Sequence, residues 1–204
     1  MVQYCSFGFV RRIALLAVDL GRRLFSLSAM LVLSGCMTAS RPMTPQDAFY
    51  DRLLSLCGQR LQGRIVSPPV AADADFAGKA LVAHVRDCSA QEMRIPFSVG
   101  DDHSRTWVVT RHGNGLRLKH DHRHEDGTED KISQYGGDTL SMGTERRQEF
   151  PADEFTKELL IREGNVAGAN NVWALEADRP SYLAYELRRP GRFFRVEFGP
   201  PRRP

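Results

Sequence analysis

The sequence predicts a mainly β protein, a single antiparallel β-barrel or sandwich of about eight strands with one N-terminal helix and one inserted helix. Apolar and polar residues alternate over much of residues 80–198, which is the pattern of strands buried on one face only. Turn residues, among them Asn114-Gly115 and Pro190-Gly191, separate these segments at short intervals. Only two segments combine helical spacing of apolar residues with first-turn signals and a terminal glycine.

Residues 44–58 predict the N-terminal helix. Thr44 is a suitable N-cap, and Pro45 fits the first helical position, where its missing N–H is not needed. Gly58 supplies the stop. One face of this helix is apolar: Phe49, Leu53 and Leu56.

Eight segments with strand character follow, and "YGGD" at residues 135–138 is interpreted as a glycine turn. Asn114-Gly115 predicts a tight hairpin between two strands. The inserted helix is predicted at residues 151–164, with acidic residues in its first turn and Gly164 as its stop. The expected strands lie in residues 80–87, 92–99, 105–112, 115–124, 139–150, 171–177, 181–189 and 192–198.

The N-terminal region has the pattern of an export signal. Arg22 and Arg23 precede an apolar run, "LFSLSAMLVLSG", of 12 residues that ends in small residues. Such a run is shorter than the roughly 20 residues that a membrane-spanning helix needs. The tetrad Leu33-Ser34-Gly35-Cys36 then resembles the lipobox of bacterial lipoproteins.

That resemblance implies cleavage before Cys36, a diacylglyceryl thioether on its sulfur and acylation, for example with palmitate, of the new amino group. Met37 occupies the position at which an Asp retains such proteins in the inner membrane, so the resemblance implies a Gram-negative outer-membrane protein with its domain in the periplasm. The expected organisation is a signal peptide at 1–35, a lipidated tether at 36–45, one β-rich domain at 46–199 and a tail at 200–204.

The charge balance argues against a nucleic-acid partner. The whole chain has 28 basic and 25 acidic residues, but residues 1–35 hold four of the former and one of the latter. The remainder therefore carries no net charge with histidine counted as neutral, whereas nucleic-acid binding needs a basic surface.

Two cysteines remain in the predicted domain, Cys57 and Cys88. In an oxidising compartment they are expected to form a disulfide. Two free buried cysteines are the alternative.

Three histidines lie at alternate positions of one predicted strand, His120, His122 and His124. Their parity matches that of Leu116 and Leu118, so all three are expected to face inward. Neutral imidazoles at this spacing suit zinc or another transition metal, with His84 or the acidic turn at 124–130 as a further ligand. A hydrogen-bonded polar layer or an exposed hairpin are the alternatives, and the outer two histidines are too far apart to share one ion easily.

Other polar and aromatic groups carry no assigned chemistry. Asp102, His103 and Ser104 are adjacent, whereas catalytic triads are assembled in space, so no catalytic residue is assigned. Five aromatic residues are interpreted as barrel core: Trp107, Trp173, Phe193, Phe194 and Phe198. Four arginines of the last hairpin are interpreted as a solvated rim partnered by Glu186 and Glu197: Arg188, Arg189, Arg192 and Arg195.

The body of the chain, around "RIPFSVGDDHSRTW" and "GLRLKHDHRHEDG", resembles uncharacterised secreted proteins of proteobacteria, a resemblance that implies no activity. The barrel outline is similar to that of lipocalin-like lipoproteins, but the chain lacks their early Gly-x-Trp strand. The first hypothesis is a lipid-anchored envelope protein with a binding or structural domain of unknown ligand. The alternative is a metal protein, and in that case a candidate hydrolase, using His120, His122 and His124. A third hypothesis is partner docking through the basic last hairpin.

Overall fold

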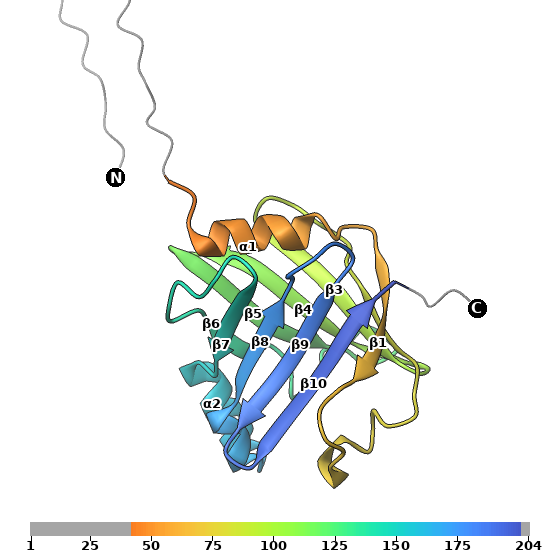
Figure 1. Cartoon of the computed structure of the whole chain (residues 1–204). Coiled ribbons are helices and arrows are strands. Elements are labelled where there is room, and N and C mark those ends of the chain that lie inside the picture. Colours follow the sequence, from red (N-terminus) through yellow and green to blue (C-terminus); the bar gives the residue numbers. More distant parts are fainter. Residues whose placement is uncertain (1–41, 201–204) are drawn as a thin grey trace, which may run out of the picture. The chain divides into compact units, whose positions relative to one another are not determined.

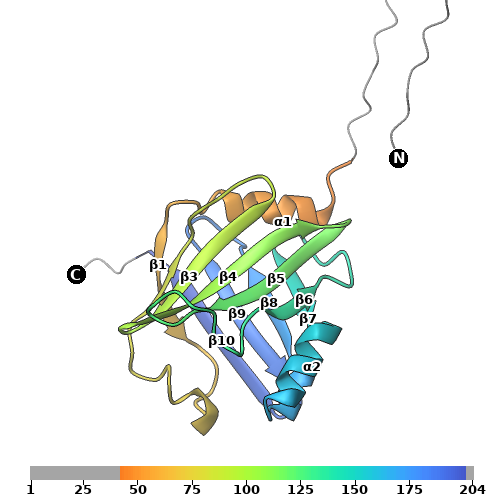
Figure 2. The same ribbon diagram turned by 180° about the vertical axis from the view of Figure 1, so that it is seen from behind.

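The computed structural model describes residues 42–200, which fold into a mainly β domain with two α-helices (Figures 1 and 2). The elements in chain order are α1 (Pro45–Leu54), β1 (Arg60–Ile65), the 3₁₀ turn η1 (Ala71–Asp73), β2 (Leu81–His84), β3 (Glu92–Val99), β4 (Asp102–His112), β5 (Gly115–His122), β6 (Tyr135–Asp138), β7 (Arg147–Pro151), α2 (Glu154–Arg162), the 3₁₀ turn η2 (Val166–Asn170), β8 (Val172–Glu176), β9 (Leu183–Arg189) and β10 (Arg192–Gly199).

All ten strands belong to one antiparallel sheet in the order β6-β5-β4-β3-β2-β1-β10-β9-β8-β7. The sheet curls so that its two edge strands, β6 and β7, approach each other and nearly close a barrel (Figures 1 and 2). Mainly antiparallel β structure with an N-terminal and an inserted helix is thus confirmed. The expected number of about eight strands is slightly too low.

The seam between the edge strands explains one of the two strands that the sequence did not reveal. Residues 135–138 form strand β6, not a turn. A Cβ on Gly136 would lie 1.9 Å from the Leu118 carbonyl oxygen of β5, and one on Gly137 would lie 1.8 Å from the Pro151 carbonyl oxygen at the end of β7. Gly136 therefore allows β6 to approach β5, and Gly137 allows it to approach the end of β7 at the seam, which is a known role of glycine in strands.

The other unexpected strand is β1, and the β4–β5 hairpin differs from the prediction by one residue. His112 pairs with Gly115, so the two central turn residues are Gly113 and Asn114. Gly113 has a φ of 56°, as the first central position of a type II′ turn requires. Because either residue pair provides turn chemistry, the sequence identifies the hairpin but not its register.

Helix α1 covers one end of the barrel (Figure 1). Thr44 and Asp47 form a reciprocal capping box, and Pro45 is the first helical residue, as predicted. Phe49 and Leu53 are fully buried against the strands. At the helix C-terminus the predicted disulfide is confirmed: Cys57 is bonded to Cys88, in the segment between β2 and β3.

Helix α2 and η2 lie beside the seam, and α2 begins at Asp153, whose carboxylate accepts a hydrogen bond from the Thr156 amide. Within residues 42–200, no helix is long and apolar enough to span a membrane.

Candidate functional site

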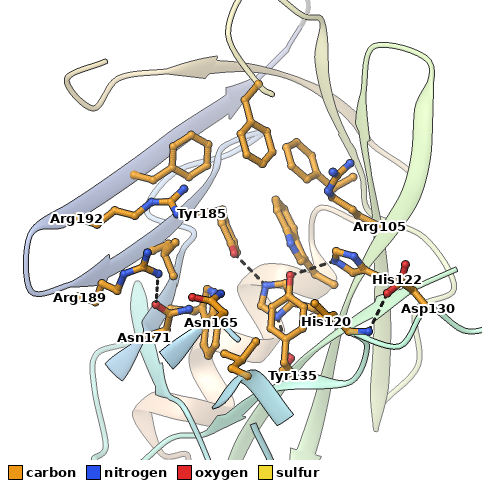
Figure 3. A pocket seen from close by; sticks show the side chains of 18 residues that line it. Arg105, His120, His122, Asp130, Tyr135, Asn165, Asn171, Tyr185, Arg189 and Arg192 are labelled. Carbon is orange, nitrogen blue, oxygen red and sulfur yellow. Dashed lines mark hydrogen bonds between the residues drawn. The ribbon is translucent and has the colours of Figure 1, made fainter. Parts of the chain in front are cut away.

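The barrel contains a cavity of about 390 Å³ at the end opposite α1 (Figure 3). Its lining residues come from the ends of β3, β5 and β9 and from the beginnings of β4, β6, β8 and β10, which all meet at this end of an antiparallel sheet. Helix α1 contacts the other ends of these strands, where Arg111 of β4 pairs with Asp47 and Asp51. One end of the barrel is therefore covered by a helix and the other is hollow.

Seven of the residues that line the cavity are Phe, Tyr or Trp, and several of their rings are stacked. Trp107 is stacked on Tyr185 with ring centroids 4.4 Å apart and planes within 6°, and Phe97 is stacked on the other side of Trp107 at 4.8 Å. Phe76, from the segment that follows η1, contacts Phe194 at 4.9 Å. Such offset and stacked rings present flat apolar surfaces to the hollow.

Four of the five aromatic residues expected in the core are buried: Trp107, Trp173, Phe194 and Phe198. Phe193 is 44% exposed, because it is adjacent to the inward-facing Phe194 and so points to the opposite face of β10. Trp107, Trp173 and Phe194 also line the cavity, which makes them part of a candidate binding surface.

His120 is part of a buried hydrogen-bonded network in the cavity floor. Its Nδ1 lies 3.0 Å from the Tyr135 carbonyl oxygen, and its Nε2 lies 3.0 Å from the Tyr185 hydroxyl. Burial lowers the pKa of His120 to about 3, so the ring is neutral at neutral pH. With the Nδ1 proton donated to the carbonyl, Nε2 accepts the hydrogen bond of the tyrosine hydroxyl.

His122 follows on the same face of β5 and reaches the cavity beside Asp130. Its Nε2 lies 3.1 Å from the Tyr135 hydroxyl. Burial lowers the pKa of His122, while Asp130 opposes that shift. Burial also raises the pKa of Tyr135, which stays protonated and hydrogen-bonds to the histidine. The inward orientation expected for His120 and His122 is therefore confirmed.

The same expectation is wrong for His124. Strand β5 ends at His122, so the alternation no longer applies, and the His124 side chain is 59% exposed. His84 is on β2, where its Nδ1 lies 3.2 Å from the Arg60 guanidinium, and it does not line the cavity. Among residues 42–200, no group of three or more His, Cys, Asp or Glu side chains could hold a metal ion. The metal hypothesis stays a prediction, testable by elemental analysis of the purified protein and of His122→Ala.

Three arginines line the cavity mouth, Arg105, Arg189 and Arg192. The expectation of a solvated rim is wrong for Arg189 and Arg192, because β9 places Tyr185, Leu187 and Arg189 on its inner face and β10 begins with Arg192 beside them. For Arg195 the expected partners, Glu186 and Glu197, are confirmed, but its side chain is only 15% exposed, so it is not part of a solvated rim. Its outward-facing neighbour Arg188 pairs instead with Glu149 of β7.

Sequence reasoning missed the tyrosines of the site as well as the arginines. Tyr135 lies in the segment that the sequence analysis interprets as a turn, so it was not assigned to the inner or outer face of a strand. Tyr185 was visible in principle, since it shares the parity of Leu183 and Leu187 within residues 181–189. The same parity extends to Arg189, and following the alternation to the strand end would have found it.

Asp102, His103 and Ser104 do not form a triad in the structure. The Asp102 carboxylate accepts hydrogen bonds from the Ser104 amide and the Arg105 guanidinium. His103 is hydrogen-bonded to Ser98 at 2.9 Å. The three residues organise the β3–β4 turn.

No protein-family model matches this chain, and no curated protein or solved structure is detectably similar to it.

Proposed function

We propose that this is a lipid-anchored protein of the bacterial cell envelope whose β-barrel domain binds a small, largely apolar ligand in the aromatic cavity. The observation that carries the proposal is a hollow of about 390 Å³ lined by stacked rings at one end of the barrel. That volume falls in the range of small-molecule sites, which are mostly apolar with a few polar groups.

A purely structural domain is the competing explanation. Protein interiors pack to crystal-like density, and voids larger than a water molecule are few because they lose contacts and stability. Here bulky rings surround a space that they do not fill, and the His120–Tyr185 pair places polar atoms among them. An apolar surface with a small number of fixed polar groups favours ligand binding over simple core packing.

The anchor is proposed from Leu33-Ser34-Gly35-Cys36, which lies outside the described residues. The disulfide between Cys57 and Cys88 is compatible with the oxidising compartment that this proposal requires.

Metabolic labelling tests the anchor. We expect radiolabelled palmitate to be incorporated into the full-length protein expressed in a Gram-negative host, and Cys36→Ser to abolish both labelling and processing. Processing that is unchanged in Cys36→Ser would exclude the lipoprotein assignment.

Fluorescence tests the pocket directly, because both tryptophans of the chain, Trp107 and Trp173, line it. We expect the uncharged probe N-phenyl-1-naphthylamine to bind the full chain saturably and to quench tryptophan emission by energy transfer. Leu187→Phe extends a ring into the cavity and should weaken binding, whereas Leu140→Phe, at an exposed position, should leave it unchanged. Absence of saturable binding would contradict the proposal.

A further inference from the structure

Arg189 differs from the other two arginines of the cavity in its partner. Arg105 pairs with Asp102 and Arg192 pairs with Asp73. The Arg189 guanidinium donates one hydrogen bond, from Nη1 to the Asn171 side-chain oxygen at 2.9 Å. Within residues 42–200 no carboxylate lies at salt-bridge distance from it, so its charge is held at the cavity by a neutral amide alone.

The surroundings of Arg189 favour the binding of an anion. Burial and the neighbouring charge of Arg192 lower the pKa of Arg189. Of these two guanidinium groups only that of Arg192 is paired with a carboxylate, that of Asp73, and this leaves the positive charge of Arg189 without an ion-pair partner on this wall. Uncompensated guanidinium groups with free N–H donors bind carboxylates and other oxyanions well.

The opposite wall has the reverse character. Asp130 lies there beside His122, across the cavity from Arg189 and Arg192 (Figure 3). Its carboxylate accepts a hydrogen bond from the Ile132 amide and has no Lys or Arg partner among the described residues. The Asp130 side chain is 38% exposed, so solvent screens its charge. Arg105, which lies beside His122 on the Asp130 side (Figure 3), is already paired with Asp102, so an anion is favoured at Arg189.

We propose that the ligand is an amphiphile with one acidic group, which binds Arg189 and Arg192 at the mouth while its apolar body lies between Trp107, Tyr185 and Trp173. This inference rests on the proposed binding function and adds the ligand class to it. It accounts for the charge of Arg189 and for the aromatic wall. The length of the body is limited by the volume of about 390 Å³.

Two fluorescent probes that share one ring system separate the two proposals. N-phenyl-1-naphthylamine is uncharged, and 1-anilinonaphthalene-8-sulfonate adds one sulfonate to the same skeleton. We expect the full-length protein to bind the sulfonate tighter. Arg189→Gln should weaken sulfonate binding at least about tenfold, which is about 1.4 kcal/mol, because hydrogen bonds to a charged group are lost. The same variant should bind the uncharged probe with unchanged affinity, which also shows that the cavity is still folded.

Arg188→Gln is the matched control, because it removes the same charge from the adjacent residue of β9, whose side chain faces outward to Glu149. It should change neither affinity, and Arg189→Lys should keep part of the preference for the sulfonate. If Arg189→Gln binds both probes like the unaltered protein, the acidic ligand is excluded while the binding function stands. If the unaltered protein binds neither probe, both proposals fail.

Discussion

The two ends of the barrel are built from the same strands but are completed in different ways. At the closed end, helix α1 inserts Phe49 and Leu53 among the strands, and the Cys57–Cys88 disulfide fixes the segment that follows it. At the open end, no comparable plug is present within the described residues, and loops with the α2–η2 segment surround a hollow. We therefore expect the closed end to contribute more to the free energy of unfolding. The open end is less tightly packed and contains an unfilled space with polar groups.

The polar groups of the two ends also differ, because those at the closed end are paired with opposite charges and some of those at the open end are not. At the closed end Arg111 is matched by two carboxylates, Asp47 and Asp51. At the open end Arg189 has an amide partner and His120 is held neutral by burial. Satisfied ion pairs are typical of structural surfaces, whereas unmatched charges and shifted pKa values gather at functional sites.

The largest expected effect contrasts one leucine from each end. Leu53→Ala should lower the free energy of unfolding by about 3–5 kcal/mol, because a fully buried side chain is removed and a cavity remains. Leu187→Ala should cost about 1–2 kcal/mol, because this side chain already borders the hollow and loses fewer contacts. Urea denaturation measures both, and equal losses would contradict the contrast between the ends.

The disulfide tests whether the closed end can be weakened without affecting the open one. Cys57 and Cys88 are 31 residues apart, so replacing both by serine should lower the stability by about 3–4 kcal/mol. Because the bond lies at the end away from the cavity, affinity for N-phenyl-1-naphthylamine should be unchanged below the unfolding transition. A parallel loss of affinity would show that the two ends are coupled.

The seam between β6 and β7 runs along the barrel from one end to the other. Substitution of a glycine in it tests how closely the two backbones approach each other. Gly137→Ala should cost about 3 kcal/mol, because the new Cβ meets the Pro151 carbonyl oxygen. Gly199→Ala is the matched control in β10, where no atom lies within 4 Å of the added Cβ and the change should stay within about 0.5 kcal/mol. If thermal or urea unfolding gives the same stability for both variants, the seam is looser than described.

The open end is also expected to give the stability of the protein a pH dependence. His120 has a pKa of about 3 in the folded protein, below its ordinary value of 6.5, so the unfolded chain binds the proton more readily between these values. The stabilising contribution of neutral His120 is complete above about pH 6.5 and is lost as the pH falls toward 3, by about 1.4 kcal/mol for each pH unit. Urea curves recorded from pH 7 to pH 4 measure it.

His120→Asn keeps a polar side chain without this titration and should flatten that dependence. The buried His122 contributes in the same direction, so a residual slope is expected. An identical slope in His120→Asn and in the unaltered protein would refute the assignment.

The fold was largely predictable because it follows from short-range patterns. The alternation in residues 92–99 and the capping signals at Thr44 identify elements whose parity and caps the structure reproduces. Strand β6 could not be found in this way, because Gly136 and Gly137 have no side chains to alternate, and the contact of Gly137 with Pro151 exists only in the closed barrel.

The candidate site was predictable in part. Parity placed His120 and His122 inside correctly, but it failed at His124 because the strand end is set by the turn that follows. The positions of Arg189 and Arg192 were predicted wrongly, because a charged side chain by itself suggests a solvent-exposed position. Only the tertiary arrangement of β9 and β10 shows that Arg189 and Arg192 face a hollow and not the bulk water.

The contact between α2 and β6 has a consequence for the solubility of the protein. The Gly136 carbonyl accepts hydrogen bonds from the Asp153 amide and the Thr156 hydroxyl, and the Gly136 amide donates to that same hydroxyl. An edge strand whose backbone groups are already satisfied offers no template to a neighbouring molecule. At Gly136 the edge strand β6 is thereby closed to pairing with the strand of another molecule.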